Sequence, residues 1–501
     1  MNSSVSLPKP AVKSSSKIDK VVFKPISAFD LYYQLTYMSA MAASGISRAK
    51  IFSLAGESDA LAATYFVAIN TLVDEMRYEY PEACRKIGIK AKSENMKSFL
   101  LRLSDALRSG EPLAEYLARE AEVQGTEYQN QYERDLEGMK QWTNAFSSIL
   151  ISTVLIVIIQ MISSMIYSMQ TGMMSGLVAT AALMACFGAW IIYRSAPKEV
   201  MTVKGSEGSS EQRHALRLLR LLLPLSLLVG AAMALLGMPM GIVLIIVGGI
   251  VAPIGYISQS SDKKVVKKDV EFSTFLRSLG GMASSSGTTV KQALTRIDLS
   301  SFPAMEPDIT RLSTRLQALV DPTICWHKFG LETGSKLISQ VVDIFYGGVK
   351  IGGDPERVGY LCSLFTAKTS QLRAKRRLAS GTFTGLTLVM QAVVSGLMLF
   401  VLSIIVNFTE MVKSVMPSNS AELAAQNIQI GMGQFSASDL QFLTIITVLM
   451  IIVISIVTAA SVIICDGGYK PKFFLFLAFT CFISGICFLV VPGMVAGILT
   501  S

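Results

Sequence analysis

The chain has 501 residues, of which 51% are apolar and only 16% are charged, with a formal net charge of +9. Soluble domains usually carry about 25% charged residues, so this composition excludes an ordinary soluble protein and predicts a membrane protein. Because the basic residues lie beside long apolar runs, we assign the positive charge to a membrane surface and predict no nucleic-acid partner.

The first segment, residues 1–27, is predicted to be a basic disordered tail. Met1–Lys24 is rich in Ser, Lys and Pro and lacks the apolar core of a signal peptide. We therefore do not expect it to be cleaved as one.

Residues 28–146 are predicted to form a first cytosolic helical domain. Its apolar residues recur at helical spacing, as in Leu100, Leu101, Leu103 and Leu107. A corner between two helices is then predicted at Gly110, Glu111 and Pro112. Gly110 accepts the left-handed conformation after a helix, Glu111 faces the positive end of the next helix, and Pro112 takes its first position.

Seven apolar runs are long enough to cross a bilayer, which takes about 20 residues. They lie at 147–167, 173–193, 221–238, 240–258, 383–406, 442–465 and 473–497. Residues 147–258 thus hold four predicted transmembrane helices with a basic cytosolic loop at 194–220. Residues 383–501 hold three, with an outer loop at 407–441.

A second cytosolic helical domain is predicted at 259–382, because it repeats features of the first at a spacing of 242 or 243 residues. Met282–Gly287 echoes Met41–Gly45, and Gly352–Pro355 echoes Ser109–Pro112. The repeated corner residues are Gly45 and Gly287, and Gly110, Glu111 and Pro112 with Gly353, Asp354 and Pro355. Thr289–Gln292 also matches a capping box. The predicted fold is all-α, with two homologous helical bundles and about seven transmembrane helices.

The basic residues also predict orientation. A cytoplasmic N-terminus places 44 of the 45 Lys and Arg residues inside, Lys413 being the exception, and leaves the C-terminus outside. The short 194–220 loop is the most informative, since long domains obey the positive-inside rule weakly. Asn407-Phe408-Thr409 is a glycosylation sequon in the outer segment, although such sequons are common by chance.

The two copies differ in charge. Residues 28–141 carry 13 basic and 17 acidic residues, a net of −4, whereas residues 259–382 carry 18 and 11, a net of +7. Two basic clusters flank the second copy, Lys263, Lys264, Lys267 and Lys268, and Arg373, Lys375, Arg376 and Arg377. They are interpreted as anchors to anionic lipids or as an electrostatic dock for an acidic cytosolic partner, and the two roles are compatible.

No catalytic site, metal site or cofactor is predicted, and the chain is not expected to be an enzyme. His214 and His327 stand alone, the seven cysteines form no CxxC pair, and Thr333–Lys336 lacks the upstream glycine of a P-loop. The seven apolar runs contain no ionisable Asp, Glu, Lys, Arg or His, which argues against a coupled transporter.

Taken together, the duplicated motifs resemble the platform proteins of type II secretion (protein F) and type IV pili. The resemblance covers roughly 28–170 and 270–406. It rests on Tyr37–Gly45, Leu279–Gly287, Ser109–Leu117 and Gly352–Leu361. Four spans separate the copies and three follow, a layout similar to the archaeal branch, which serves the archaellum and archaeal pili.

The resemblance implies a non-enzymatic platform in the cytoplasmic membrane, acting as a homodimer. A cytosolic hexameric secretion ATPase would dock on the soluble domains and drive pilin or archaellin subunits from the bilayer into a filament. The two basic clusters are the predicted ATPase contacts. The alternative is a secondary transporter, but transporter repeats normally lie within the spans.

Overall fold

A computed structural model describes residues 23–166, 171–203, 208–415 and 437–500. Within these ranges the regular structure is helical, apart from one isolated bridge between Thr202 and Ser335. The predicted all-α fold is therefore confirmed.

The chain divides into two compact units. The first comprises Met1–Tyr132, Lys267–Thr333 and Leu337–Ser370, and the second comprises Glu133–Val266, Gly334–Lys336 and Gln371–Ser501. Most of both copies belongs to the first unit, whereas residues 133–146, 259–266, 334–336 and 371–382 belong to the second unit with the predicted spans. The copies therefore pack together as one compact unit.

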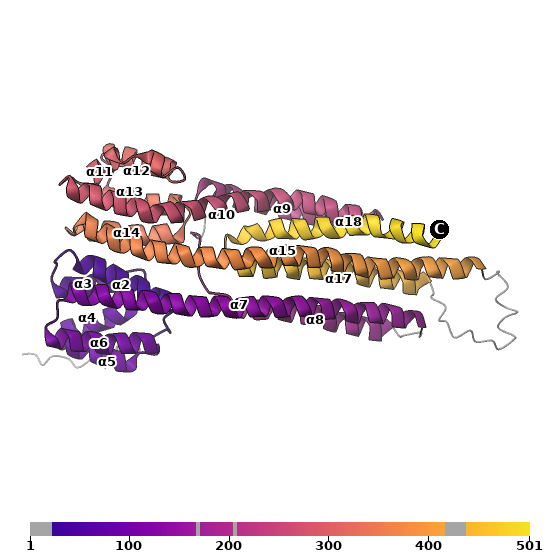
Figure 1. Cartoon of the computed structure of the whole chain (residues 1–501), viewed down its shortest axis with the longest axis horizontal. Helices are drawn as coiled ribbons and strands as arrows, with labels where there is room; N and C mark the ends of the chain where they lie inside the picture. Colours follow the sequence, from indigo (N-terminus) through magenta and orange to yellow (C-terminus); the bar gives the residue numbers. More distant parts are fainter. Residues whose placement is uncertain (1–22, 167–170, 204–207, 416–436, 501) are drawn as a thin grey trace, which may run out of the picture. The chain divides into compact units, whose positions relative to one another are not determined.

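The α-helices of the two copies correspond in order. In the first copy they are α2 (Ala28–Ala42), α3 (Arg48–Glu57), α4 (Ala63–Met76), α5 (Tyr80–Lys90) and α6 (Glu94–Ser109), followed by the start of α7 (Leu113–Ile166). In the second they are the end of α10 (Met240–Ser285), α11 (Val290–Arg296), η1 (Leu299–Ser301), α12 (Glu306–Gln317), α13 (Pro322–Glu332), α14 (Lys336–Lys350) and the start of α15 (Pro355–Val415). The helices from α3 to α7 and their counterparts begin 242 or 243 residues apart, so the duplication extends over the whole soluble part of each copy (Figure 1).

Side-chain caps explain where several of these helices begin. Ser47 Oγ accepts a bond from the Lys50 amide at 3.4 Å, and Thr289 Oγ1 accepts one from the Gln292 amide at 3.4 Å. Both satisfy an amide that the first turn leaves without a partner. A full capping box, with both reciprocal bonds, occurs at Ser209 at the start of α9 (Ser210–Leu235).

Each copy has an aromatic core. In the first copy Phe52, Phe66 and Phe99 are fully buried, and in the second copy the buried rings include Phe275 and Phe329. Burial of one such ring stabilises the fold by about 1.5–3 kcal/mol, so these clusters account for the compactness of helices that are short by themselves.

Seven described helices are long and apolar enough to cross a membrane, which confirms the predicted number. They are α7, α8 (Thr171–Ser195), α9, α10, α15, α17 (Ala437–Asp466) and α18 (Phe473–Thr500). Within the second unit α17 packs against α8 and α18. The chain is thus a multi-pass membrane protein.

Helices extend into both predicted inter-span loops. In the 194–220 loop, α8 continues to Ser195 and α9 starts at Ser210. In the 407–441 loop, α15 continues to Val415 and α17 starts at Ala437, with 416–436 outside the described residues. Asn407 therefore lies in a helix. The predicted tail falls outside the described residues up to 22, but Phe23 is buried and stacks on Tyr65 at 4.3 Å.

Candidate functional site

The first predicted basic cluster lies on α10. Lys263 and Lys267 are exposed and form no ion pair with the described residues. Lys264 pairs with Glu211, and Lys268 lies 2.6 Å from a carboxylate oxygen of Asp308. Two of the four lysines are therefore already engaged by the chain itself.

The second predicted cluster lies at the point where α15 enters the second unit, and half of it is buried. Arg373 is 3% exposed and donates from Nε to Glu199 at 2.8 Å. Arg376 is 2% exposed. These two arginines cannot meet a docking partner, so the prediction was wrong for them. Lys375 is exposed and pairs with Glu133 at 2.6 Å, and Arg377 is partly buried.

Arg376 holds the end of a membrane helix. Its guanidinium donates to the carbonyls of Ile464 and Cys465 in the last turn of α17 and to that of Pro197, each at 2.8 Å. Carbonyls at a helix C-terminus lack intrahelical partners and carry partial negative charge. Gly467 follows with φ +68°, and a Cβ there would lie 2.3 Å from the guanidinium carbon of Arg376. The glycine is needed both for the turn and for the space that Arg376 occupies.

A buried ionic cluster in the same unit was missed by the sequence analysis. Lys472 Nζ lies 2.7 Å from Asp466 and 3.3 Å from Asp262, and Arg377 lies 3.9 Å from Asp262. Asp466 ends one apolar run and Lys472 precedes the next, so charges directly at the ends of predicted spans were the available signal. Burial raises the pKa of neighbouring Tyr469 to about 12, and its hydroxyl donates to the Gln212 carbonyl at 3.2 Å.

A short backbone pairing, here called the clasp, joins residues 201–203 to 334–336 within the second unit. The Val203 amide donates to the Gly334 carbonyl at 3.2 Å, and the Lys336 amide donates to the Met201 carbonyl at 3.1 Å. The Gln212 side chain, 1% exposed, donates to the same Gly334 carbonyl at 3.2 Å. The segment Thr333–Lys336, predicted to be a loop, is therefore held in place by backbone hydrogen bonds to residues 201–203 and by the Gln212 side chain.

The predicted corners of the first copy have the expected backbone. Gly45 and Gly110 have φ of +68° and +73°, the left-handed conformation that follows a helix end. Glu111 pairs with Arg119 in the next helix. Pro112 precedes α7 rather than occupying its first position, and its carbonyl accepts the bond from the Tyr116 amide at 3.1 Å.

In the second copy the earlier corner is as predicted and the later one is shifted by one residue from the prediction. Gly287 has φ +58°, but at the later corner the left-handed residue is Gly352, at +95°, not the predicted Gly353. Asp354 caps α15 by accepting from the amides of Glu356 and Arg357 at 3.3 Å, and Pro355 is the first residue of that helix.

Gly353 is needed for close packing between the copies. A Cβ there would lie 2.5 Å from Ser44 Oγ of the first copy and 2.7 Å from the Gly348 carbonyl oxygen. Ser44 Oγ itself donates to that carbonyl at 3.2 Å. At the same seam Tyr32 of the first copy packs on Phe365 of the second at 4.7 Å between ring centroids. Burial raises the pKa of Tyr32. The two copies thus share one apolar seam.

The spans contain an uncharged polar hub. Gln391 Nε2 lies 2.9 Å from both Ser455 Oγ and Ser484 Oγ and 3.3 Å from Ser395 Oγ, so it bonds α15 to α17 and α18. All four side chains are at least 97% buried. Such bonds hold membrane helices together where apolar packing alone gives little preference. In the described part of the chain, no group of three His, Cys, Asp or Glu side chains is placed to hold a metal ion.

Comparison with known proteins agrees with the predicted resemblance. Residues 35–181 match the family model "Type II secretion system (T2SS), protein F". "Flagella accessory protein J" of Methanocaldococcus jannaschii is 27% identical over 80% of this chain and 72% of its own length. The protein of the same name from Methanococcus voltae is 22% identical over 63% of this chain and 59% of its own length. No solved structure matches the chain.

Proposed function

We propose that the chain is the cytoplasmic-membrane platform protein for assembly of an archaeal filament of the archaellum or type IV pilus kind. The observation that carries this proposal is similarity to "Flagella accessory protein J" over 80% of the chain, together with the protein F match on the first copy. The duplicated soluble part and the seven spans agree with it. Neither comparison points to a secondary transporter.

The finer mechanism is part of the proposal. A hexameric cytosolic secretion ATPase docks on the soluble copies of a homodimer and drives pilin-like or archaellin subunits into the filament. The N-terminus is cytoplasmic and the C-terminus is outside, as the distribution of basic residues indicates. Of the predicted docking cations, the exposed Lys263, Lys264, Lys267 and Lys375 remain candidates, of which Lys264 and Lys375 also pair with acidic residues of the chain.

The test begins with deletion of the gene and complementation, scored by counting filaments in electron micrographs. Deletion is expected to abolish filaments and the chain is expected to restore them, whereas normal filaments in the deletion strain would contradict the proposal. Pull-down of the detergent-solubilised chain with the cognate ATPase, with and without nucleotide, then tests the coupling.

Charge reversal tests the docking cations. Lys263→Glu with Lys267→Glu is expected to weaken ATPase binding, and binding to the unaltered chain is expected to weaken as salt rises. The matched control is Lys140→Glu, which reverses a half-exposed lysine of the first copy paired only with Glu137. Normal binding by the 263/267 variant would remove the docking role of these lysines.

A further inference from the structure

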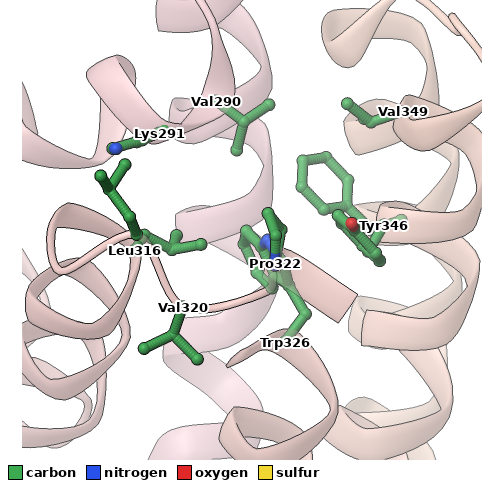
Figure 2. A pocket seen from close by; sticks show the side chains of 10 residues that line it. Val290, Lys291, Leu316, Val320, Pro322, Trp326, Tyr346 and Val349 are labelled. Atoms are coloured by element: carbon green, nitrogen blue, oxygen red, sulfur yellow. The ribbon is translucent and has the colours of Figure 1, made fainter. Parts of the chain in front are cut away.

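An apolar pocket opens on the second copy, among α11, α12, α13 and α14. Its volume is about 220 Å³. The floor includes Trp326 and Phe345, which are 3% and 1% exposed. Figure 2 shows Lys291 and Leu316 on one side and Tyr346 and Val349 on the other, with Pro322 and Trp326 between them.

Leu319 lies at the edge of this pocket with an unusual backbone. It has φ +59° and is 84% exposed. A leucine in the left-handed region costs about 1–3 kcal/mol, and a leucine this exposed gains nothing from the core of its own chain. Val320 and Ile324 beside it are 41% and 51% exposed, so the apolar surface is continuous.

The first copy provides an internal comparison, because 242 residues separate Leu319 from Arg77. Arg77 has the same backbone, at φ +60°, but a charged side chain. Tyr80, at the position of Pro322, packs on Phe52 at 4.6 Å, and Lys86 lies 3.6 Å from the ring centroid of Tyr78, at the position of Val320. The first copy thus covers this surface with its own tyrosines and charges, and the second leaves it open and apolar.

Size and charge indicate what the pocket accepts. Small-molecule sites usually enclose about 300–1,000 Å³, so about 220 Å³ suits a single large side chain better. Lys291 lines the pocket and forms no ion pair among the described side chains, and the second copy carries a net charge of +7. The chain's own tail, with Lys9, Lys13, Lys17, Lys20 and Lys24, has the wrong sign for this surface.

We propose that this pocket, with Leu319 and Lys291 at its rim, binds a large apolar side chain flanked by acidic residues on the secretion ATPase. The inference rests on the proposed function, which supplies that partner. Interfaces commonly concentrate their affinity in one such anchor within a pocket, with opposite charges nearby that select the partner.

The experiment measures binding of the purified cognate ATPase to the full-length chain in nanodiscs. Leu319→Arg copies the residue of the first copy, so the backbone accepts it, and Lys291→Glu reverses the rim charge. Each variant is expected to weaken binding at least about tenfold, the loss typical of a truncated anchor. Arg77→Gln, at the equivalent left-handed position of the first copy, is the matched control and is expected to bind within about twofold of the unaltered chain.

Unchanged binding by both Leu319→Arg and Lys291→Glu would overturn the pocket proposal and leave the proposed function intact. A change in the oligomeric mass of the unbound chain, with ATPase affinity unchanged, would also overturn it, since the pocket would then join copies of the chain. If the unaltered chain bound no ATPase, both the proposed docking of the ATPase and the pocket proposal would be contradicted. Loss of filaments on deletion of the gene would still support the platform role.

Discussion

Arg376 donates three side-chain hydrogen bonds to backbone carbonyls of the second unit. Its three bonds to carbonyl oxygens are charge-assisted and buried, and each such bond contributes about 1.5–3 kcal/mol before the cost of burial. We therefore expect Arg376→Gln to lower the free energy of unfolding by about 2–4 kcal/mol.

The matched control is its neighbour Lys375→Gln. Lys375 is half-exposed and paired with a half-exposed Glu133, so its loss is expected to cost no more than about 1 kcal/mol. Both are measured by thermal unfolding in detergent. Equal loss in the two variants would contradict the role given to Arg376.

Gly353 lies where a side chain would meet neighbouring atoms. In Gly353→Ala the added methyl group meets a backbone oxygen that cannot move freely, so we expect a loss of about 1–3 kcal/mol from overpacking at the seam. Gly281→Ala places a methyl group in open space on a helix and is expected to be neutral or to stabilise by up to about 1 kcal/mol. A neutral Gly353→Ala would show that the backbone at Gly348 and the Ser44 side chain can shift enough to accept the methyl group.

Which residues of the second basic cluster are buried could not be predicted from the sequence. The run from Arg373 to Arg377 shows four like charges, but nothing in its order tells which side chains point to a helix end and which to water. The buried Arg376 donates hydrogen bonds to the carbonyls of Pro197, Ile464 and Cys465, which lie 88 to 179 residues away in the chain. Gly110 could be predicted because its turn is local, and Gly352 lies 242 residues later in an equivalent local turn, in which the Gly353 amide donates to the Gly348 carbonyl at 3.0 Å.

The pairing of residues 201–203 with 334–336 in the clasp can be tested by an engineered disulfide. Thr202 and Ser335 face each other between the two backbone bonds, as a non-hydrogen-bonded antiparallel pair, whose Cα atoms lie about 4.5 Å apart. That separation suits a disulfide. Thr202→Cys with Ser335→Cys is expected to crosslink under mild oxidant.

The crosslink is detected by mass spectrometry of the linked peptides. Val200→Cys with Ser335→Cys, two residues out of register, is the control and is expected to crosslink poorly. Similar yields from both pairs would mean that residues 201–203 and 334–336 are not held in register. If the crosslinked chain still assembles filaments, then the clasp can stay closed throughout filament assembly.

The polar hub of the spans supports a prediction for α15, α17 and α18. Side-chain bonds between membrane helices average about 0.6 kcal/mol and reach about 1.7 kcal/mol. A double-mutant cycle with Gln391→Leu and Ser484→Ala is expected to show coupling in this range, because Gln391 Nε2 donates to Ser484 Oγ at 2.9 Å. It is measured by unfolding in mixed micelles, and additive effects would argue against the hub.

For the whole molecule, the number of spans and the duplication followed from sequence, since both depend on long, regular patterns. Each apolar run lies largely in one of the seven helices, but the runs underestimate the lengths of α7, α9, α10 and α15, which continue through polar turns beyond the apolar segment. Packing of the two copies into one unit was not predictable, because it depends on contacts such as Tyr32 with Phe365, which no local pattern encodes.

The orientation of the chain in the membrane can be tested with tags at its two ends. With epitope tags at the two ends, protease added to intact protoplasts is expected to remove the C-terminal tag and spare the N-terminal one. Inside-out vesicles are expected to give the reverse. An accessible N-terminal tag on intact protoplasts would overturn the assignment of the basic residues to the cytosol.

The contact between Arg376 and Gly467 has a consequence for variation in relatives and in libraries. Any side chain at 467 takes the volume of the guanidinium, and any shorter side chain at 376 leaves carbonyls of α17 without a donor. Each change alone is expected to destabilise the end of α17. We therefore expect positions 376 and 467, which lie 91 residues apart in the chain, to covary among relatives. A substitution at one of them should be accompanied by a substitution at the other.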